Sequence, residues 1–289
     1  MIILAMDTSG PCASVALMQD GVITHEETAR HGLTHSQTVL PMAERALECA
    51  GLQPKDVNLF ACAVGPGSFT GVRIGVTTVK ALAHSVGARC IGVDALEALD
   101  VPATFFLVGL GVRAFPEYAK QIVQAGHAVG CHTMGHAAGA IKKDEDFVLR
   151  DIGRFNKMMS EEIEPGFSTD LFRFPGGSSS YKARIKAKVR DAGYAWFDWN
   201  TMTGDAQYSF SSDREMLEYT LGQAHGKDVV ILLMHEGKTR TRRILPELVA
   251  YFRENGYEFR RLSTGEEDRE ILSRCGAHFM LPDAEQGGH

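Results

Sequence analysis

The amino-acid sequence predicts a two-part α/β protein. In the first hundred residues, three apolar strand-like runs in succession precede alternating helices and strands, which indicates a mixed sheet. From residue 101 onward, short apolar strands alternate with periodic, helix-length segments, which is typical of a parallel sheet or barrel. The composition agrees, because 44% hydrophobic and 23% charged residues exclude a disordered, collagenous or coiled-coil chain.

Local patterns place the elements of the first part. Asp20-Gly21 between two apolar runs predicts a hairpin, and the apolar residues from 39 to 50 recur with the period of a helix. We expect strands over 2–6, 13–18, 22–28, 57–64 and 89–93, and helices over 35–50, 69–86 and 94–99.

The same periodicities place the elements of the second part. We expect strands over 101–108, 127–131, 171–174, 194–199, 228–234 and 257–261. The helices between them are expected over 115–125, 144–163, 181–192, 213–224 and 242–255. From Ser263 the sequence is polar with little periodicity, so we expect a loosely held tail over 263–289.

Charge and cysteine usage limit the environment of the protein. The net charge of −6 and the pI of about 6.0 argue against direct nucleic-acid binding through bulk attraction. The sequence contains neither a membrane-length apolar run nor a secretory signal pattern, so we expect no membrane partner. The six scattered cysteines lack CxxC spacing and predict reduced thiols in a cytoplasmic protein.

A glycine-rich loop opens the helix expected at 69–86. It reads Gly65-Pro66-Gly67-Ser68, and two further glycines follow at Gly71 and Gly75. Such a loop can hold a phosphate on backbone amides at the helix N-terminus. It can equally be a tight turn that lets helix and sheet approach closely, which is the commoner use of glycine.

Together with Asp7-Thr8-Ser9 after the first strand, His35-Ser36-Gln37 and the segment 92–99, this loop resembles the N-terminal lobe of the TsaB family. The resemblance covers about residues 1–99 and implies an actin/Hsp70-like (RNase H-like) lobe.

The TsaB resemblance implies association rather than catalysis. A TsaD-like partner would contact residues 35–86, with His35, Phe69 and Arg73 at the interface. Apolar residues on the same helices could equally be core. The second lobe of that family is absent here, so no nucleotide cleft can close and we expect no ATP binding.

Chemical signals are sharper in the second part, where polar sets follow three strands. His132 and His136 are four residues apart just after a strand, so both imidazoles can face one divalent metal. Arg173-Phe174-Pro175-Gly176-Gly177 follows another strand, and His235 ends a third. Polar residues at successive strand ends suit a barrel with its active site at that rim.

These motifs resemble the NodB-homology polysaccharide deacetylases of carbohydrate esterase family four. The resemblance covers about residues 100–262, beginning with Val101-Pro102-Ala103-Thr104-Phe105-Phe106. It implies an incomplete (β/α) barrel that hydrolyses the acetamide groups of an N-acetylated glycan.

The deacetylase resemblance also implies roles for individual residues. His132 and His136 would hold a divalent metal, zinc or similar, while His235 would protonate the leaving amine and Arg173 would orient an aspartate base. The substrate would contact Pro175, Gly176, Trp199 and Leu233. Taken singly, Arg173 could be a surface ion pair, Trp199 simple core and His235 an ordinary strand-end histidine.

The sequence departs from the deacetylase pattern at two places. The first strand of that family carries Thr-Phe-Asp-Asp-Gly, which supplies the base and a third metal ligand, and no such sequence precedes Val101 here. Met202 stands where the family has an aspartate that tunes the acid histidine, so we expect a less basic, less well oriented His235 and a weakly bound metal.

The sequence therefore supports three functional hypotheses. The first is an impaired or inactive deacetylase-like hydrolase, with domains at 1–99 and 100–262 and a tail at 263–289. The second is a TsaB-like dimerisation subunit of the complex that makes threonylcarbamoyladenosine in tRNA. The third is an engineered or artefactual fusion without an evolved function.

Overall fold

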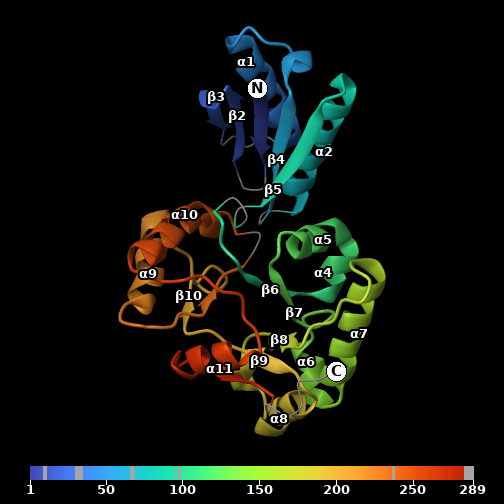
Figure 1. Ribbon diagram of the computed structural model, residues 1–289, viewed down its shortest axis with the longest axis vertical. Coiled ribbons are helices and arrows are strands. Elements are labelled where there is room, and N and C mark those ends of the chain that lie inside the picture. The colour runs from blue at the N-terminus through green and yellow to red at the C-terminus, as the bar shows by residue number, and fades with distance from the viewer. Residues whose placement is uncertain are drawn as a thin grey trace. The chain divides into compact units, whose positions relative to one another are not determined.

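The computed structural model describes residues 1–8, 12–29, 35–65, 69–94, 96, 99–235 and 238–282 (Figure 1). Its chain divides into two compact units, and each unit draws on more than one stretch of sequence. The first unit contains Met1–Asp100, Gly204–Leu217 and Met234–Asn255. The second contains Val101–Thr203, Glu218–Leu233 and Gly256–His289.

A five-stranded mixed sheet forms the centre of the first unit, in the order β3-β2-β1-β4-β5. The hairpin strands pair antiparallel with β1, and β4 and β5 extend the sheet in parallel. The elements are β1 (Ile2–Asp7), β2 (Ala13–Gln19), β3 (Val22–Ala29), α1 (His35–Cys49), η1 (Pro54–Asp56), β4 (Leu59–Gly65), α2 (Phe69–Val86) and β5 (Arg89–Asp94). The expected mixed sheet is confirmed; of the helix expected at 94–99, most lies outside the described residues.

The core of this sheet follows the alternation of its strands. Leu4 and Met6 on β1 face the same side as Val15 and Leu17 on β2, and all four are nearly or fully buried. Apolar side chains of both helices complete this cluster, among them Val39, Met42, Ala46, Val79 and Ala83. The two helices therefore pack on one face of the sheet. The helical period of 3.6 residues and the strand period of two residues each place apolar side chains on the surface that the other element covers.

The glycines at the start of α2 allow a close approach to the end of β1. A Cβ atom at Gly71 would lie 2.0 Å from the backbone oxygen of Thr8, and one at Gly75 would lie 2.6 Å from its hydroxyl. The Thr8 hydroxyl donates a 2.7 Å hydrogen bond to the Gly71 carbonyl. At these two positions glycine is required for packing; residues 66–68 of the loop lie outside the described part.

The remaining segments of the first unit supply α10 (Thr239–Glu254) and the beginning of α9 (Asp213–Ala224). Asp213 accepts hydrogen bonds from Arg243. Arg242 donates a 3.1 Å hydrogen bond to Asp7, so the carboxylate at the end of β1 is paired with a cation of the same chain.

The second unit is built on a five-stranded sheet in the order β12-β9-β8-β7-β6 and on a separate parallel pair, β10 with β11. Strands β6 to β9 are parallel, and β12 joins antiparallel to β9. The strands are β6 (Thr104–Leu107), β7 (Ala128–Cys131), β8 (Leu171–Phe172), β9 (Ala195–Phe197), β10 (Thr201–Met202), β11 (Leu232–Leu233) and β12 (Phe279–Met280). The helices are α4 (Gly109–Ala114), α5 (Pro116–Gln124), α6 (Ala138–Lys143), α7 (Phe147–Glu162), η2 (Ser178–Ser180), α8 (Ala183–Asp191) and α11 (Glu266–Ser273).

The described strands of this unit form an open arrangement and not a closed barrel, as expected for a barrel without its first strand. The strand expected at 257–261 is absent, and those expected at 171–174 and 228–234 shrink to two residues each. In a closed barrel the first strand lies between the second strand and the last. Without it, the segment 257–261 has no ladder partner, and a strand needs one.

The expectation of a loose tail is wrong for residues 263–282. This segment forms α11 and β12, and Leu272 and Cys275 are buried with Leu171, Ala195 and Phe197. A few buried side chains are enough to hold a short segment in place. So few apolar residues do not recur often enough to produce a helical or strand period in the sequence.

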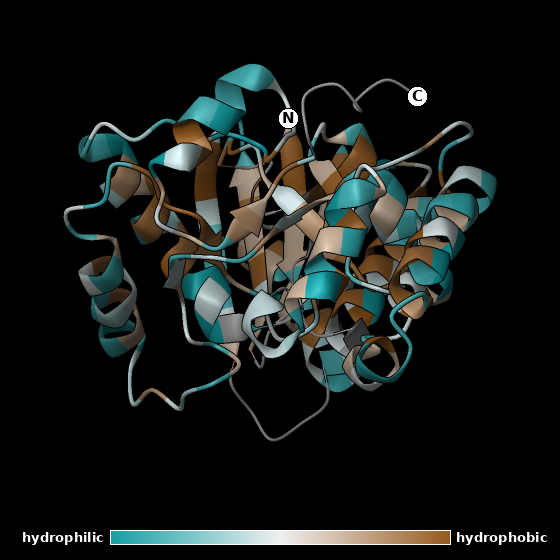
Figure 2. Cartoon of the chain, turned by 90° about the horizontal axis from the view of Figure 1, so that it is seen from below, coloured by the Kyte–Doolittle hydropathy of each residue, from teal (hydrophilic) through white to brown (hydrophobic). Residues whose placement is uncertain are grey.

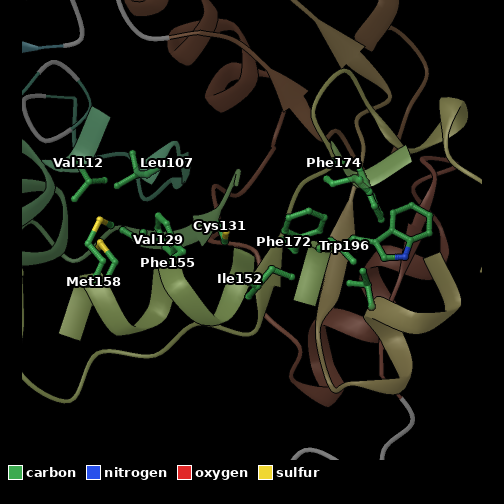
Figure 3. Close-up of a cluster of buried hydrophobic side chains, with 14 of the residues drawn as sticks. Leu107, Val112, Val129, Cys131, Ile152, Phe155, Met158, Phe172, Phe174 and Trp196 are labelled. Carbon is green, nitrogen blue, oxygen red and sulfur yellow. The ribbon is translucent and has the colours of Figure 1, made fainter. Parts of the chain in front are cut away.

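The core of the second unit lies between α7 and the sheet (Figure 3). Ile152, Phe155 and Met158 project from α7 and pack with Val129 and Phe172 of the strands. Hydrophobic residues concentrate on the strands, while the helices carry many hydrophilic residues (Figure 2). Among the described helices, none is both long and apolar enough to cross a membrane.

Candidate active site

The loop after β7 holds the two histidines of the predicted metal site. Thr133 and His136 both adopt left-handed backbone conformations, with φ values of 69° and 54°. Such conformations are uncommon outside glycine and are strained for a β-branched residue such as threonine. They persist only where surrounding contacts hold them, and they cluster at functional sites.

Hydrogen bonds from three directions hold this loop. The Met134 amide donates to the carboxylate of Asp151 on α7 at 2.7 Å, and the Leu110 amide donates to the Met134 carbonyl at 2.7 Å. The Thr133 hydroxyl accepts from the Ala137 amide at 3.1 Å. Asp151 is only 2% exposed, so its carboxylate is a buried support for the loop backbone.

The two imidazoles lie close together, and a backbone carbonyl orients that of His132. His132 Nδ1 lies 2.8 Å from the Arg173 carbonyl oxygen, which can only accept, so Nδ1 carries the proton and the lone pair is on Nε2. The ring centroids of His132 and His136 are 4.9 Å apart, with the rings 77° from coplanar. This arrangement suits two ligands of one ion.

The residues present do not complete a catalytic metal site. Across the described ranges, His, Cys, Asp and Glu form no group of three or more that could hold a metal ion. Catalytic zinc normally has three protein ligands. The pair His132 and His136 therefore matches only part of such a ligand set.

His235 has a carboxylate partner that the sequence analysis missed. Its Nδ1 lies 2.6 Å from Asp205 Oδ1, and its backbone amide donates to Asp205 Oδ2 at 2.9 Å. The expectation that Met202 leaves His235 poorly oriented is therefore wrong, because Asp205 orients the ring from three positions further along the chain. The signal available in the sequence was the Gly204-Asp205 turn itself, which follows β10.

Asp205 is ionised in this setting. Burial acts to raise its pKa, but hydrogen bonds from the His235 ring, the His235 amide and Thr241 outweigh it, and the pKa of the carboxyl is lowered. The Thr241 hydroxyl donates to Oδ2 at 2.8 Å. The Asp205 side chain is 4% exposed and that of His235 is 43% exposed, so a buried carboxylate supports an accessible imidazole.

Arg173 is buried and is not the surface ion pair that its residue type allowed. It is 9% exposed, and its Nε donates a 3.0 Å hydrogen bond to the Phe197 carbonyl. The guanidinium carbon lies 4.1 Å from the centroid of the Phe106 ring and 5.9 Å from that of Trp199. Burial lowers the pKa of Arg173 to about 10, partly offset by the negative charge of Asp198.

The predicted substrate-contacting residues occupy two loops of the second unit. Pro175 is buried and its carbonyl accepts a 3.0 Å hydrogen bond from Tyr181, while Gly176 is exposed with a φ of 74°. Trp199 is half-buried, and a Cβ atom at Gly177 would lie 3.2 Å from its ring. Leu233 is 8% exposed at the end of β11.

Asp198 holds the turn that carries these residues, a role that sequence reasoning also missed. Its carboxylate accepts hydrogen bonds from the Ser178 amide at 2.9 Å and from the Ser178 hydroxyl at 2.7 Å. The structure thus gathers His132, His136, Arg173 and Trp199 within the second unit. His235 and Asp205 belong to the first unit.

The predicted partner residues lie on the two helices of the first sheet. His35 begins α1 half-buried beside Gly71, and Arg73 is exposed on α2. The side chain of Phe69 lies outside the described part.

Comparison with known proteins identifies two classes in one chain. The family model of the tRNA N6-adenosine threonylcarbamoyltransferase TsaD matches residues 17–140, and that of polysaccharide deacetylases matches residues 92–197. The two matches overlap between residues 92 and 140. The chain therefore joins a segment similar to the TsaD family to a segment similar to polysaccharide deacetylases.

Individual relatives of both kinds match the chain, and the deacetylase match given below extends beyond the second part. The TsaB protein of Escherichia coli, named for tRNA threonylcarbamoyladenosine biosynthesis, is 42% identical over 97 residues, covering 33% of this chain and 41% of that protein. The chain thus spans less than half the length of this relative. A peptidoglycan-N-acetylglucosamine deacetylase of Bacillus cereus is 28% identical over 236 residues, covering 78% of this chain and 82% of its own.

A solved structure supports the deacetylase-like fold. A carbohydrate esterase family four (CE4) esterase from Streptococcus mutans is 28% identical and superimposes with a TM-score of 0.52, covering 58% of this chain and 77% of that chain.

Proposed function

We propose that residues 100–262 are a deacetylase-like hydrolase domain for N-acetylated glycans whose activity is near background. One observation carries this proposal: the oriented imidazole of His235 keeps its carboxylate, whereas the His132 and His136 pair keeps only part of a ligand set. In this proposal residues 1–99 are a separate TsaB-like lobe. The compact unit that contains them also includes Gly204–Leu217 and Met234–Asn255, which the proposal assigns to the hydrolase domain.

Hydrolysis of an acetamide needs an activated water and an acid for the departing amine. His235 can supply the acid. The ionised Asp205 holds the proton on Nδ1, so proton transfer to the leaving nitrogen falls to Nε2.

The second requirement is a general base that takes a proton from the attacking water. The carboxylate that contacts the histidine loop in the described part belongs to Asp151, and it is buried against the Met134 amide. It therefore supports the loop and cannot take the place of an accessible base. Arg173 lacks an aspartate to orient, which supports the same conclusion.

The remaining site residues keep their proposed roles. His132 and His136 would hold zinc or a similar ion weakly, since two neutral imidazoles lack the charge of a carboxylate ligand. Trp199 and Leu233 would border the acetyl group, with the turn at Pro175 and Gly176 beside the sugar.

The test is an acetate-release assay on N-acetylglucosamine oligomers with zinc or cobalt added in excess. We expect turnover at background, because general-base catalysis alone contributes about 10²–10⁴-fold. Robust turnover by the unmodified chain that is abolished by His132→Ala would refute the proposed impairment.

A second candidate function is association of the TsaB-like lobe with a TsaD-like partner through residues 35–86. It is favoured by 42% identity to TsaB over 97 residues and by the intact packing of Gly71 and Gly75 on Thr8. His35, Phe69 and Arg73 would contribute to that interface.

Co-purification with a TsaD protein at micromolar concentration tests the association. Arg73→Glu should weaken capture, and Lys143→Glu, an exposed change on α6 outside residues 35–86, is the matched control. A folded chain that captures no TsaD excludes this function. If hydrolysis and capture both fail, a fusion without evolved function becomes the better explanation.

A further inference from the structure

The first turn of α10 is held by carboxylates of other segments. Its N-cap residue, Lys238, makes no side-chain capping hydrogen bond. Four consecutive residues that follow it bind three acids: Arg240 and Arg243 bind Asp213, Thr241 binds Asp205, and Arg242 binds Asp7. Tertiary contacts therefore set the position of this turn.

Two of these contacts come from adjacent residues of α10. Thr241 is 3% exposed and its hydroxyl donates to Asp205 Oδ2 at 2.8 Å, while Arg242 Nη1 donates to Asp7 Oδ1 at 3.1 Å. Asp205 in turn holds His235 through the ring and the backbone amide. Because Thr241 and Arg242 share a peptide bond, a contiguous series of contacts joins Asp7 to the His235 ring, and energetic coupling can follow such a series.

Asp7 belongs to the TsaB-like lobe and lies on a fixed element. It is the last residue of β1, where it pairs with Ser14 of β2. The far end of α10 is bound to the same stretch of chain, because Arg253 donates to the carbonyls of Leu99 at 2.8 Å and Asp100 at 3.0 Å. Both ends of α10 are thus anchored on residues 1–100, and all these residues belong to the first compact unit.

We propose that Asp7 is a positioning residue for His235 and acts through Arg242 and the first turn of α10. The TsaB-like lobe thereby helps to hold the acid of the hydrolase-like domain. This inference rests on the proposed role of His235, but the contacts themselves need no turnover. The alternative is an ion pair that only adds stability, and it predicts no change at the His235 ring as long as the chain is folded.

The test is NMR of the intact chain labelled with nitrogen-15 histidine, with the His235 signals assigned by their loss in His235→Gln. The tautomer of the neutral ring and the exchange of its Nδ1 proton with water report how firmly Asp205 holds the ring. Asp7→Asn removes the charge and keeps the shape of the side chain. We expect the minor tautomer and the exchange rate to rise by about two- to fivefold, as for the loss of a partly exposed ion pair.

Further variants test the route through Arg242. Arg242→Gln should give the same change as Asp7→Asn, and the double variant should give no more than either alone, because both remove one pair. Asp20→Asn removes a carboxylate of the same lobe that pairs with the N-terminal amine, and it should leave the ring signals unchanged.

Two results overturn the proposal. One is a His235 ring that keeps its parental signals in folded Asp7→Asn and Arg242→Gln. The other is an equal change in Asp20→Asn, which would reflect net charge alone. Acetate release is not part of this measurement, so the failure of this proposal and the failure of the proposed hydrolase are seen in separate experiments.

Discussion

The two histidine sites of the chain differ in what supports them. His235 is oriented by a buried, ionised carboxylate, whereas His132 is oriented by the backbone carbonyl of the buried Arg173, which has no carboxylate partner among the described residues. In the proposed hydrolase, acid chemistry and water activation would be carried by separate chain segments. Loss of the strand that carries Thr-Phe-Asp-Asp-Gly would remove the carboxylates needed to activate water. It would leave the acid, His235, intact.

The largest predicted effect tests this separation. Adding a Thr-Phe-Asp-Asp-Gly strand and its helix ahead of Val101 should raise acetate release by about 10²–10⁴-fold, because it restores a general base. The measurement is metal-supplemented acetate release from N-acetylglucosamine oligomers. A well-folded graft that stays at background while binding metal would contradict the idea that a base is what the chain lacks.

Met202→Asp is the matched control for the graft. It should change acetate release little in the unmodified chain, since water would still lack its base and Asp205 already orients His235. A large gain from this single change would show that the acid site is the deficient one.

The next effect concerns Arg173, whose carbonyl contacts His132. The fall of the Arg173 pKa from 12.5 to about 10 corresponds to a cost of about 3 kcal/mol for the buried charge at neutral pH. Because the folded-state pKa is the lower one, the cost is complete below pH 10 and fades between about pH 10 and 12.5. Arg173→Met removes this charge and loses one hydrogen bond of about 1 kcal/mol.

Arg173→Met should therefore stabilise the protein by about 2 kcal/mol at pH 7. Urea denaturation measures the change. A clear loss of stability would mean that the guanidinium is already satisfied.

Asp205→Asn is expected to act in the opposite direction. The variant should lose about 1 kcal/mol at pH 7, because a charge-assisted hydrogen bond to His235 is weakened. The folded-state pKa of Asp205 is lowered, so its contribution is present above the unfolded pKa of about 3.9 and is lost as pH falls through the folded value.

The stability difference between Asp205→Asn and the parent should accordingly shrink in acid. Thr241→Val removes one of the donors that lower the pKa of this carboxyl, so its smaller stability loss should also shrink in acid. A difference that is constant from pH 7 to pH 3 would argue against an ionised Asp205.

The smallest expected effect is on metal content. After dialysis against zinc-free buffer, elemental analysis should find well under one zinc per chain, and His132→Ala should remove what remains. Tight, stoichiometric metal binding would show that a third ligand completes the pair His132 and His136. The contrast with His235, which keeps its carboxylate partner, would then be lost.

Most helices could be predicted because their signal lies within a few residues. The apolar period placed a helix at 35–50, close to the observed α1, and the spacing of His132 and His136 was enough to place both rings near each other. Strands were predicted less well where the partner was missing: 228–234 reads as a long strand, yet the ladder of β11 covers two residues. A strand is a property of two segments, and the sequence pattern reports only one.

The sequence by itself determined the amphipathic helices and the mixed sheet of the first hundred residues, because periodicity is local. Only the tertiary structure decided that Asp205 supports His235 thirty positions away, that β12 pairs with β9, and that Arg173 is buried. Each of these depends on which distant segments meet. Burial and ion pairing are set by that meeting, so no window of sequence contains them.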